Sequence, residues 1–434
     1  MSKRTKAAKK RTRGAHDTHV SPQEPRSAKK SHSGVGAGGA DAALPALSSL
    51  SDIPTLEKLP LHEDQRAAYE TCCNTLVSEG VDAAELACAC VVRLDRAFPL
   101  VVSAAGLQRA EFSFRFGVVR EPSCAVGDWV CLRRPAGHDM AVIEFVLPRQ
   151  SDIARWRGNN RGKKQTLAAN VDIVLVAQAL SRRPVDIDRI VRSAVIAQDC
   201  GAACAVVLTK ADRAGAALLA QDISLIREVL GDKICVAVTA AGARGADGRN
   251  AGGRGADDAG GADGAALEDD MARVCLEHRA LWGIEGVREL VPAGIVGIVL
   301  GESGAGKSTL LNALLGKNLL EVGHVRAKDD AGRHTTVARR MVDLPQAGVV
   351  VDEPGLRSLP LVGHERGLKL VFPDVAEAAT LCRFRDCTHT KEPGCAVHEQ
   401  VYEGRIPEVR AEAYRRLAEE MRRSSDSLDP DVVL

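Results

Sequence analysis

The chain has 434 residues, and its 58 Lys and Arg residues almost balance its 57 Asp and Glu residues, which leaves a formal charge of +1. This balance excludes a uniformly basic nucleic-acid coat and an acidic scaffold. With 45% hydrophobic residues, and at about 150 residues per domain, the chain can bury two or three separate cores.

Targeting signals and cysteine usage indicate the compartment. No apolar run approaches the roughly 20 residues that span a bilayer, and the N-terminus lacks the apolar stretch of a signal peptide. Most of the 13 cysteines lie in apolar, strand-like text, which is typical of small buried residues in a reducing compartment. We therefore expect a cytoplasmic monomer that does not bind membranes.

Residues 1–47 form a basic segment with ten Lys and Arg residues against three Asp and Glu residues. Its Ala, Ser, Gly and Thr residues bury too little apolar surface to offset the entropy of ordering, so we expect a disordered arm. Two interpretations stay open for this arm, a solvated tail and a contact with a phosphate backbone.

Residues 84–150 contain short β-rich runs separated by turn residues, a pattern that favours a small closed barrel. The expected strands are Cys90–Leu94, Leu100–Val102, Phe112–Val119, Asp128–Arg133 and Met140–Val146.

Residues 165–377 alternate apolar strands with helical stretches, which is the signature of a parallel sheet covered by helices. The expected elements are strands at Val171–Val176, Cys204–Leu208, Ile234–Val238 and Ile295–Leu300, and helices at Ile187–Ala197, Ala216–Leu230 and Met271–Trp282. Residues 241–266 hold almost only small and charged residues, so we expect a disordered insertion there.

One segment fits the phosphate-binding pattern G-x-x-x-x-G-K-[ST]. It consists of Gly301, Glu302, Ser303, Gly304, Ala305, Gly306, Lys307 and Ser308. The apolar run IVGIVL precedes it and the helical stretch STLLNALLG follows it, which is the context that the motif requires. Glycines let backbone N–H groups surround phosphates at a helix N-terminus. We expect Lys307 to contact the β- and γ-phosphates and Ser308 to hold Mg²⁺.

Two further segments are expected to sense the γ-phosphate and its metal. Asp352 ends the apolar run VVVD, where it would help to hold Mg²⁺, and Gly355 would offer its N–H to the γ-phosphate. Thr335 and Thr336 lie in the polar segment GRHTT, whose order would depend on that phosphate.

A base-reading motif precedes the phosphate loop in the chain. It is the T-K-x-D variant of N-K-x-D, formed by Thr209, Lys210, Ala211 and Asp212. The Asp212 carboxylate can accept from N1–H and the exocyclic amine of guanine, a donor pair that adenine lacks. At the end of the next strand, Thr239 and Ala240 fit the element whose backbone N–H contacts guanine O6.

This order is reversed relative to a GTPase in which the phosphate loop comes first. Loops at the carboxyl ends of parallel strands share one edge of the sheet, so rewired connections can permute the chain and leave the site intact. The sequence therefore predicts a circularly permuted P-loop GTPase domain that binds GTP and Mg²⁺.

Residues 378–434 are polar and end in a helical stretch, Glu408–Arg422. They contain three thiols and one imidazole within 14 residues, the closed tetrahedral set of a structural Zn²⁺ site, with one ion per chain. These are Cys382, Cys387, His389 and Cys395. The surrounding basic residues favour an RNA contact and a solvated helix face equally. They are Arg383, Arg385, His398, Arg405, Arg410, Arg415 and Arg416.

With these motifs in place, residues 84–422 resemble the ribosome small subunit-dependent GTPase A family. The shared segments include VGDWV, TKAD, GESGAGKS, VDEPGLRSL and CRFRDCTH–EPGCAV. The resemblance implies an OB-fold barrel, a permuted GTPase domain and a mainly helical zinc module. It also implies GTP hydrolysis that the small ribosomal subunit stimulates late in its maturation, with its rRNA as a partner. The matched nucleotide site covers residues 209–212 and runs from Gly301 to Thr309, and the matched zinc ligands are the four residues named above.

The sequence departs from the family at Thr209, where Asn is usual, and at Glu353, where Thr is usual. Leu356 stands where many GTPases carry a water-orienting Gln, so we expect another group, His334, to orient the attacking water. The motifs leave two alternative functions, a nucleotide-gated RNA-binding assembly factor with incidental turnover and a metabolic P-loop kinase. The kinase is disfavoured because it has no use for T-K-x-D.

Overall fold

The computed structural model describes residues 50, 52–95, 98–115, 124–156, 164–240, 262–317, 339–353, 361 and 363–426. The expected arm at 1–47 lies outside these residues, as do 241–261 of the expected insertion. Helix α5 begins at Ala262, so the last residues of the expected insertion are helical.

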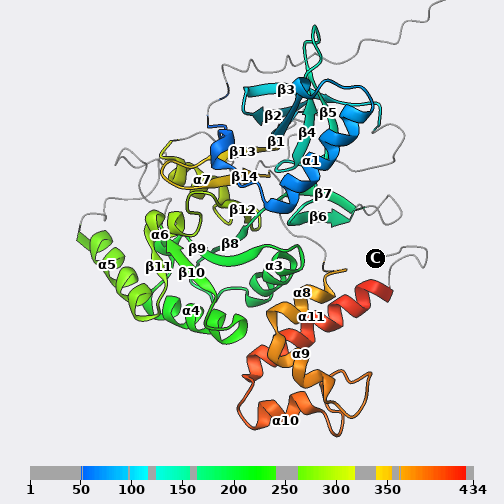
Figure 1. Ribbon diagram of the computed structural model, residues 1–434. Helices are drawn as coiled ribbons and strands as arrows, with labels where there is room; N and C mark the ends of the chain where they lie inside the picture. Colours follow the sequence, from blue (N-terminus) through cyan, green and yellow to red (C-terminus); the bar gives the residue numbers. More distant parts are fainter. Residues whose placement is uncertain are drawn as a thin grey trace, which may run out of the picture. The chain divides into compact units, whose positions relative to one another are not determined.

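A helix that the sequence pattern did not reveal, α1 (Glu63–Ser78), precedes a closed five-stranded barrel (Figure 1). The barrel strands are β1 (Leu86–Leu94), β2 (Pro99–Ser103), β3 (Gly106–Phe112), β4 (Trp129–Arg133) and β5 (Ala141–Val146). Strand β1 pairs with both β2 and β4, and β3 runs parallel to β5, which closes the barrel in an OB-like order.

Of the strand expected at Phe112–Val119, residues 116–119 lie outside the described residues, and only Phe112 of the rest is in a strand. Strand β3 starts at Gly106, because the turn before it sends the chain straight back along β2, with Ser103 opposite Gly106. Gly106 takes a φ of 95°, a backbone conformation that favours glycine. The turn therefore fixes the start of β3 earlier in the chain than the apolar pattern suggested.

Between Ile173 and Asp352 the chain builds a mostly parallel sheet in the order β11-β10-β9-β8-β12-β14-β13 (Figure 1). Its strands are β8 (Ile173–Ala179), β9 (Ala203–Thr209), β10 (Cys235–Thr239), β11 (Leu281–Trp282), β12 (Val296–Leu300), β13 (Arg339–Asp343) and β14 (Val349–Asp352). The associated helices are α3 (Ile187–Asp199), α4 (Ala216–Leu230), α5 (Ala262–Glu277), α6 (Gly283–Glu289) and α7 (Lys307–Leu315).

The helix expected at Met271–Trp282 ends early, at Glu277. Leu281 and Trp282 instead form β11, which pairs in parallel with Ala237 and Val238 of β10. Unpaired backbone groups at the edge of β10 gain hydrogen bonds from this pairing, which outweighs the helical pattern of the sequence.

The C-terminal part is helical, with α8 (Glu365–Val371), α9 (Pro373–Thr380), α10 (Ala396–Tyr402) and α11 (Glu408–Asp426). Helix α9 runs across the boundary expected between 377 and 378, and α11 packs on α3, α4 and α8. Among the described residues, no helix is long and apolar enough to cross a bilayer.

The barrel, the parallel sheet and the C-terminal helices share one of the buried clusters. One buried cluster contains Cys90 of the barrel, Ile298 of the sheet and Leu417 of α11. The barrel strand β1 also pairs with β13, Leu94 opposite Arg339, so the barrel and the parallel sheet share a continuous hydrogen-bonded ladder.

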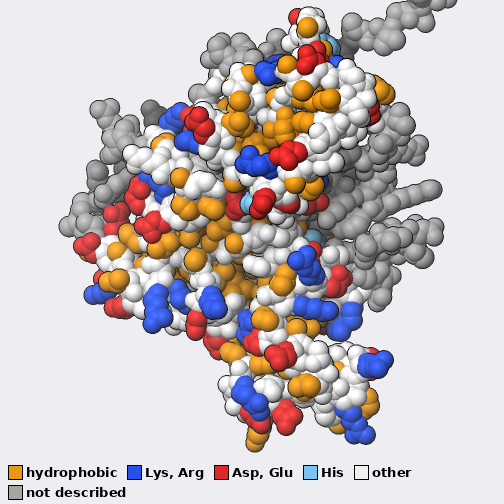
Figure 2. Space-filling view, viewed as in Figure 1, with side chains coloured by type: hydrophobic (Ala, Val, Ile, Leu, Met, Phe, Trp, Pro, Cys, Tyr) orange, Lys and Arg blue, Asp and Glu red, His pale blue; other side chains and the backbone are white. Residues whose placement is uncertain are grey.

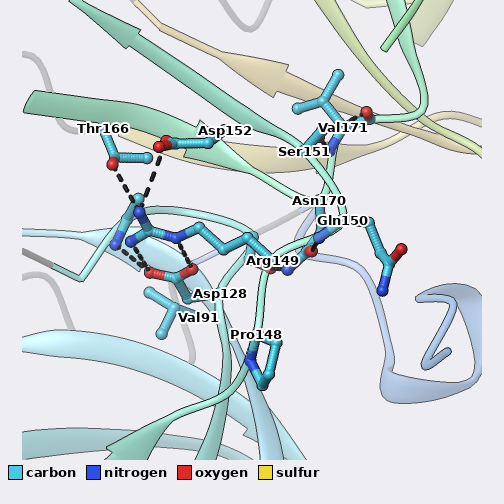
Figure 3. A network of polar contacts seen from close by, with 12 residues as sticks. Val91, Asp128, Pro148, Arg149, Gln150, Ser151, Asp152, Thr166, Asn170 and Val171 are labelled. Carbon is cyan, nitrogen blue, oxygen red and sulfur yellow. Dashed lines mark hydrogen bonds and ion pairs between the residues drawn. The ribbon is translucent and has the colours of Figure 1, made fainter. Parts of the chain in front are cut away.

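A buried polar network lies where the barrel meets the hairpin of β6 (Asp152–Trp156) and β7 (Lys164–Ala169) (Figure 3). Arg149 donates to both carboxylate oxygens of the fully buried Asp128, at 2.7 and 2.8 Å, and to Thr166 Oγ1 at 2.6 Å. Nearby, Asn170 accepts from Gln65 Nε2 of α1 at 3.0 Å and donates to Gly127 O at 2.8 Å. The network therefore joins α1, the barrel and the hairpin.

We predict that Arg149→Met lowers the free energy of unfolding by about 3–5 kcal/mol, because it leaves the Asp128 carboxylate buried without its cation. Denaturant titration measures the loss. Arg416→Met is the control, since its pair with Asp188 is exposed and contributes about 0–1 kcal/mol. Equal effects of the two substitutions would contradict a structural role for the buried pair.

Candidate functional site

The phosphate loop connects β12 to α7, and two of its positions require glycine. A Cβ at Gly301 would lie 2.5 Å from the carbonyl oxygen of Ala177, and Gly306 has a φ of 86°. Lys307 Nζ donates to the carbonyl oxygens of Gly301 at 2.5 Å and Glu302 at 2.9 Å. The ammonium group is thus held over the loop, where an anionic ligand would meet it.

The base-reading motif is bonded directly to this loop. Thr209 ends β9 with its side chain buried, and its hydroxyl donates to Ala305 O at 2.7 Å. Lys210 adopts a left-handed φ of 58°, and its Nζ donates to Gly304 O at 2.5 Å. The Thr209 hydroxyl therefore supplies a tie between the two loops in place of the amide of an Asn.

A cavity of about 740 Å³ opens beside these loops. Its lining residues are Ala179, Leu180, Ser181, Arg182, Lys210, Asp212, Arg213, Ala214 and Gly215. Thr239 and Ala240 are not among them, although Thr239 is the register partner of Thr209 on β10. Asp212 thus contributes a carboxylate to a cavity formed at the carboxyl ends of β8 and β9.

The cavity is also lined by three residues that no sequence motif marks, Ser181, Arg182 and Arg213. The available signal was position, because Ser181 and Arg182 follow the carboxyl end of β8 and Arg213 follows the T-K-x-D motif.

Asp352 ends β14, directly beside the strand that carries the phosphate loop, with Val351 opposite Ile298 of β12. Burial raises the pKa of Asp352, and the Arg340 guanidinium, 3.9 Å from Asp352 Oδ2, acts in the opposite direction. A carboxylate in this setting gains from a nearby cation, so it fits the chemistry of a Mg²⁺ site.

Four of the expected site residues lie outside the described part of the chain. They are His334, Thr335, Thr336 and Gly355. Their roles stay predictions.

The four expected zinc ligands come together in the C-terminal part. The ligand atoms of Cys382, Cys387, His389 and Cys395 all lie within 4.8 Å of one another. His389 Nδ1 is 3.5 Å from Cys382 Sγ and 3.6 Å from Cys395 Sγ. Burial lowers the pKa of His389, which favours the neutral imidazole that a metal binds. The donor set and its closeness fit a closed tetrahedral site for Zn²⁺.

A carboxylate that the sequence pattern did not reveal orders the loop of this cluster. Glu392 accepts from Thr388 N at 2.9 Å, from Thr388 Oγ1 at 2.5 Å and from Thr390 N at 2.9 Å. These bonds hold the pKa of Glu392 well below its usual range. Arg415 of α11 also donates to His389 O at 3.1 Å, so the helix positions the loop.

Comparisons with known proteins agree with this geometry. The profile of the family described as RsgA GTPase matches residues 267–362. The small ribosomal subunit biogenesis GTPase RsgA of Streptomyces avermitilis is 36% identical over 77% of this chain and 79% of its own. The protein of the same name from Streptomyces coelicolor is 37% identical over 77% of this chain and 80% of its own.

This chain belongs to the RsgA GTPase family. Its structure is also similar to the crystal structure of YjeQ from Thermotoga maritima, with a TM-score of 0.54 and 23% identity, over 77% of this chain and 98% of that one. The fold and the motif order therefore agree with a circularly permuted GTPase of the RsgA family.

Arg410, which the sequence placed among residues able to meet RNA, is instead a buried anchor of this RsgA-family chain. It pairs with Asp374 at 2.7 Å and donates to the carbonyl oxygens of Val371 and Val229. Its guanidinium also lies 4.9 Å from the ring centre of Phe372. One side chain of α11 thus binds together α4, α8 and α9.

We predict that Thr209→Val weakens GTP binding about fivefold, which corresponds to the loss of one hydrogen bond of about 1 kcal/mol. The substitution keeps the side-chain shape but removes the donor to Ala305 O. A nucleotide titration measures the change. Thr239→Val is the control, because the contact expected there uses the backbone. An unchanged affinity in Thr209→Val would show that the tie is not needed.

Proposed function

We propose that the chain hydrolyses GTP during late maturation of the small ribosomal subunit, that the particle stimulates hydrolysis, and that hydrolysis is coupled to release. The observation that carries the proposal is the bonding of the T-K-x-D loop to the phosphate loop through Thr209 and Ala305, next to a cavity containing Asp212. The Streptomyces relatives are named small ribosomal subunit biogenesis GTPases, which supports the small ribosomal subunit as the particle.

In this proposal the chain's own groups bind the nucleotide at fixed positions. Asp212 accepts from guanine, and a backbone N–H at Thr239 or Ala240 donates to its O6. The N–H groups of residues 301–308 and the Lys307 ammonium contact the phosphates, with Thr309 following in α7. Ser308 and Asp352 hold Mg²⁺, which neutralises charge on the phosphates.

We further propose that Thr335, Thr336 and Gly355 sense the γ-phosphate and that a neutral imidazole at His334 orients the attacking water. In this proposal the particle brings His334 into position, so hydrolysis depends on the particle. Changing His334 to Ala should abolish stimulated hydrolysis while nucleotide affinity is kept.

We propose that rRNA contacts an exposed surface near the Cys/His cluster. The Arg383 guanidinium lies 5.4 Å from the ring centre of the exposed Phe384, and Arg385 is exposed beside it. Basic groups next to aromatic rings suit stacking on unpaired bases. Figure 2 shows both signs of charge interspersed on the visible face, so such a contact would be local.

Single-turnover GTP hydrolysis with and without purified small subunits tests the proposal. We expect slow hydrolysis by the free chain and a large acceleration by the particle. Tight, nucleotide-dependent binding to the particle without acceleration would favour the alternative, a nucleotide-gated RNA-binding assembly factor with incidental turnover.

We predict that Asp212→Asn weakens GTP binding about tenfold or more and increases affinity for xanthosine triphosphate. The reason is that xanthine presents a carbonyl where guanine has its amino group, and bonds to a charged group contribute about 1.5–3 kcal/mol each. Titration with both nucleotides measures the exchange. The exposed Asp232→Asn is the control, and an unchanged preference in Asp212→Asn would remove this residue from the site.

We predict that metal analysis finds about one Zn²⁺ per chain and that Cys387→Ala loses it. The segment is too small and polar to fold without its ligands, so it should unfold locally and lose stimulation by the particle, while basal hydrolysis persists. The buried Cys275→Ala is the control and should keep both the metal and the stimulation. Full stimulation in Cys387→Ala would contradict the coupling.

A further inference from the structure

An ion pair lies one residue beyond the regular ladder between β13 and β14. Arg339 Nε is 2.7 Å from Glu353 Oε2. Arg339 is the first described residue after the segment that contains Thr335 and Thr336, and Glu353 directly follows Asp352. The pair therefore joins the two stretches of chain that are expected to sense the γ-phosphate.

The strand register explains why these two side chains meet. Arg340 is opposite Asp352 in the antiparallel ladder, so the next position in each direction places Arg339 opposite Glu353. Directly opposite residues of antiparallel strands lie close enough for their side chains to interact. The last backbone pairing of this ladder is at Asp352, and the ion pair adds a side-chain contact one position beyond it.

Arg339 is itself held from the other side. It is the register partner of Leu94 on the barrel strand β1. Strand pairing therefore links β1 to Arg339, and the ion pair links Arg339 to Glu353, the residue next to Asp352 in the chain.

The two side chains of the pair differ in burial, and this difference decides how costly the loss of either partner is. The Glu353 side chain is only 6% exposed, whereas that of Arg339 is 25% exposed. A carboxylate so removed from water is costly without a cation, while the arginine can still reach solvent. Removing Arg339 alone should therefore damage the site more than removing Glu353 alone.

We propose that Arg339 and Glu353 are positioning residues, which hold the end of β14 so that the Asp352 carboxylate is placed for Mg²⁺. This inference rests on the proposed GTP site. In this inference the pair does not bind the nucleotide or the metal. It acts by fixing the residue that follows Asp352 to the neighbouring strand.

The test is the Mg²⁺ concentration needed for half-maximal GTP binding by the full chain. In Arg339→Met/Glu353→Thr, which removes both charges together, we expect this concentration to rise about three- to tenfold, with GDP affinity in the absence of Mg²⁺ unchanged. Glu353→Gln should shift it in the same direction. If Arg339→Met alone is too unstable to purify, these two variants still decide the question.

Arg133→Met is the matched control, because Arg133 pairs with the 4% exposed Glu144 at 2.7 Å and is itself 30% exposed, but lies in the barrel. It should lose stability without changing the Mg²⁺ requirement. A wild-type Mg²⁺ requirement in the double variant, or the same shift in the control, would overturn the inference. Failure of the unaltered chain to bind GTP at any Mg²⁺ concentration would instead overturn the proposed function.

Discussion

The site depends on one constraint, which is that parallel strands bring their carboxyl ends to the same edge of a sheet. The phosphate loop follows β12, the T-K-x-D loop follows β9, and Asp352 ends β14. These strands are far apart in the chain, but in the sheet order β9-β8-β12-β14 they lie within a few strands of one another. Chain order can therefore be permuted without moving the functional groups. The Thr209–Ala305 hydrogen bond then fixes two of these loops to each other.

Two other parts of the protein are attached to this sheet by pairing and by buried charge. The barrel strand β1 continues the sheet through β13, so the barrel contacts the strand that leads to Asp352. On the C-terminal side, Arg410 binds α11 to α4, α8 and α9, and Arg415 continues from α11 to the backbone of His389. Each attachment therefore joins another part of the chain to the parallel sheet or to the helices that cover it.

Local patterns in the sequence predicted a large part of this organisation. The alternation of apolar runs located β8, β9, β10 and β12, and the glycine spacing at 301–306 located the phosphate loop, because both depend on residues that are neighbours in the chain. The spacing of Cys382, Cys387, His389 and Cys395 predicted their cluster for the same reason. Where a long-range partner competed with a local pattern, as at Leu281 and Trp282, the prediction was wrong.

By itself, the sequence determined the fold class, the motifs and the spacing that brings the Cys/His cluster together, since these follow from the periodicity and chemistry of adjacent residues. Only the tertiary structure decided that Thr209 bonds to the phosphate loop, that Arg410 is an anchor rather than an RNA contact, and that Arg339 meets Glu353. Each of these contacts joins residues from different elements. Their geometry depends on sheet register and helix packing, which are set by the burial of the whole chain and leave no signal in the spacing of the residues themselves.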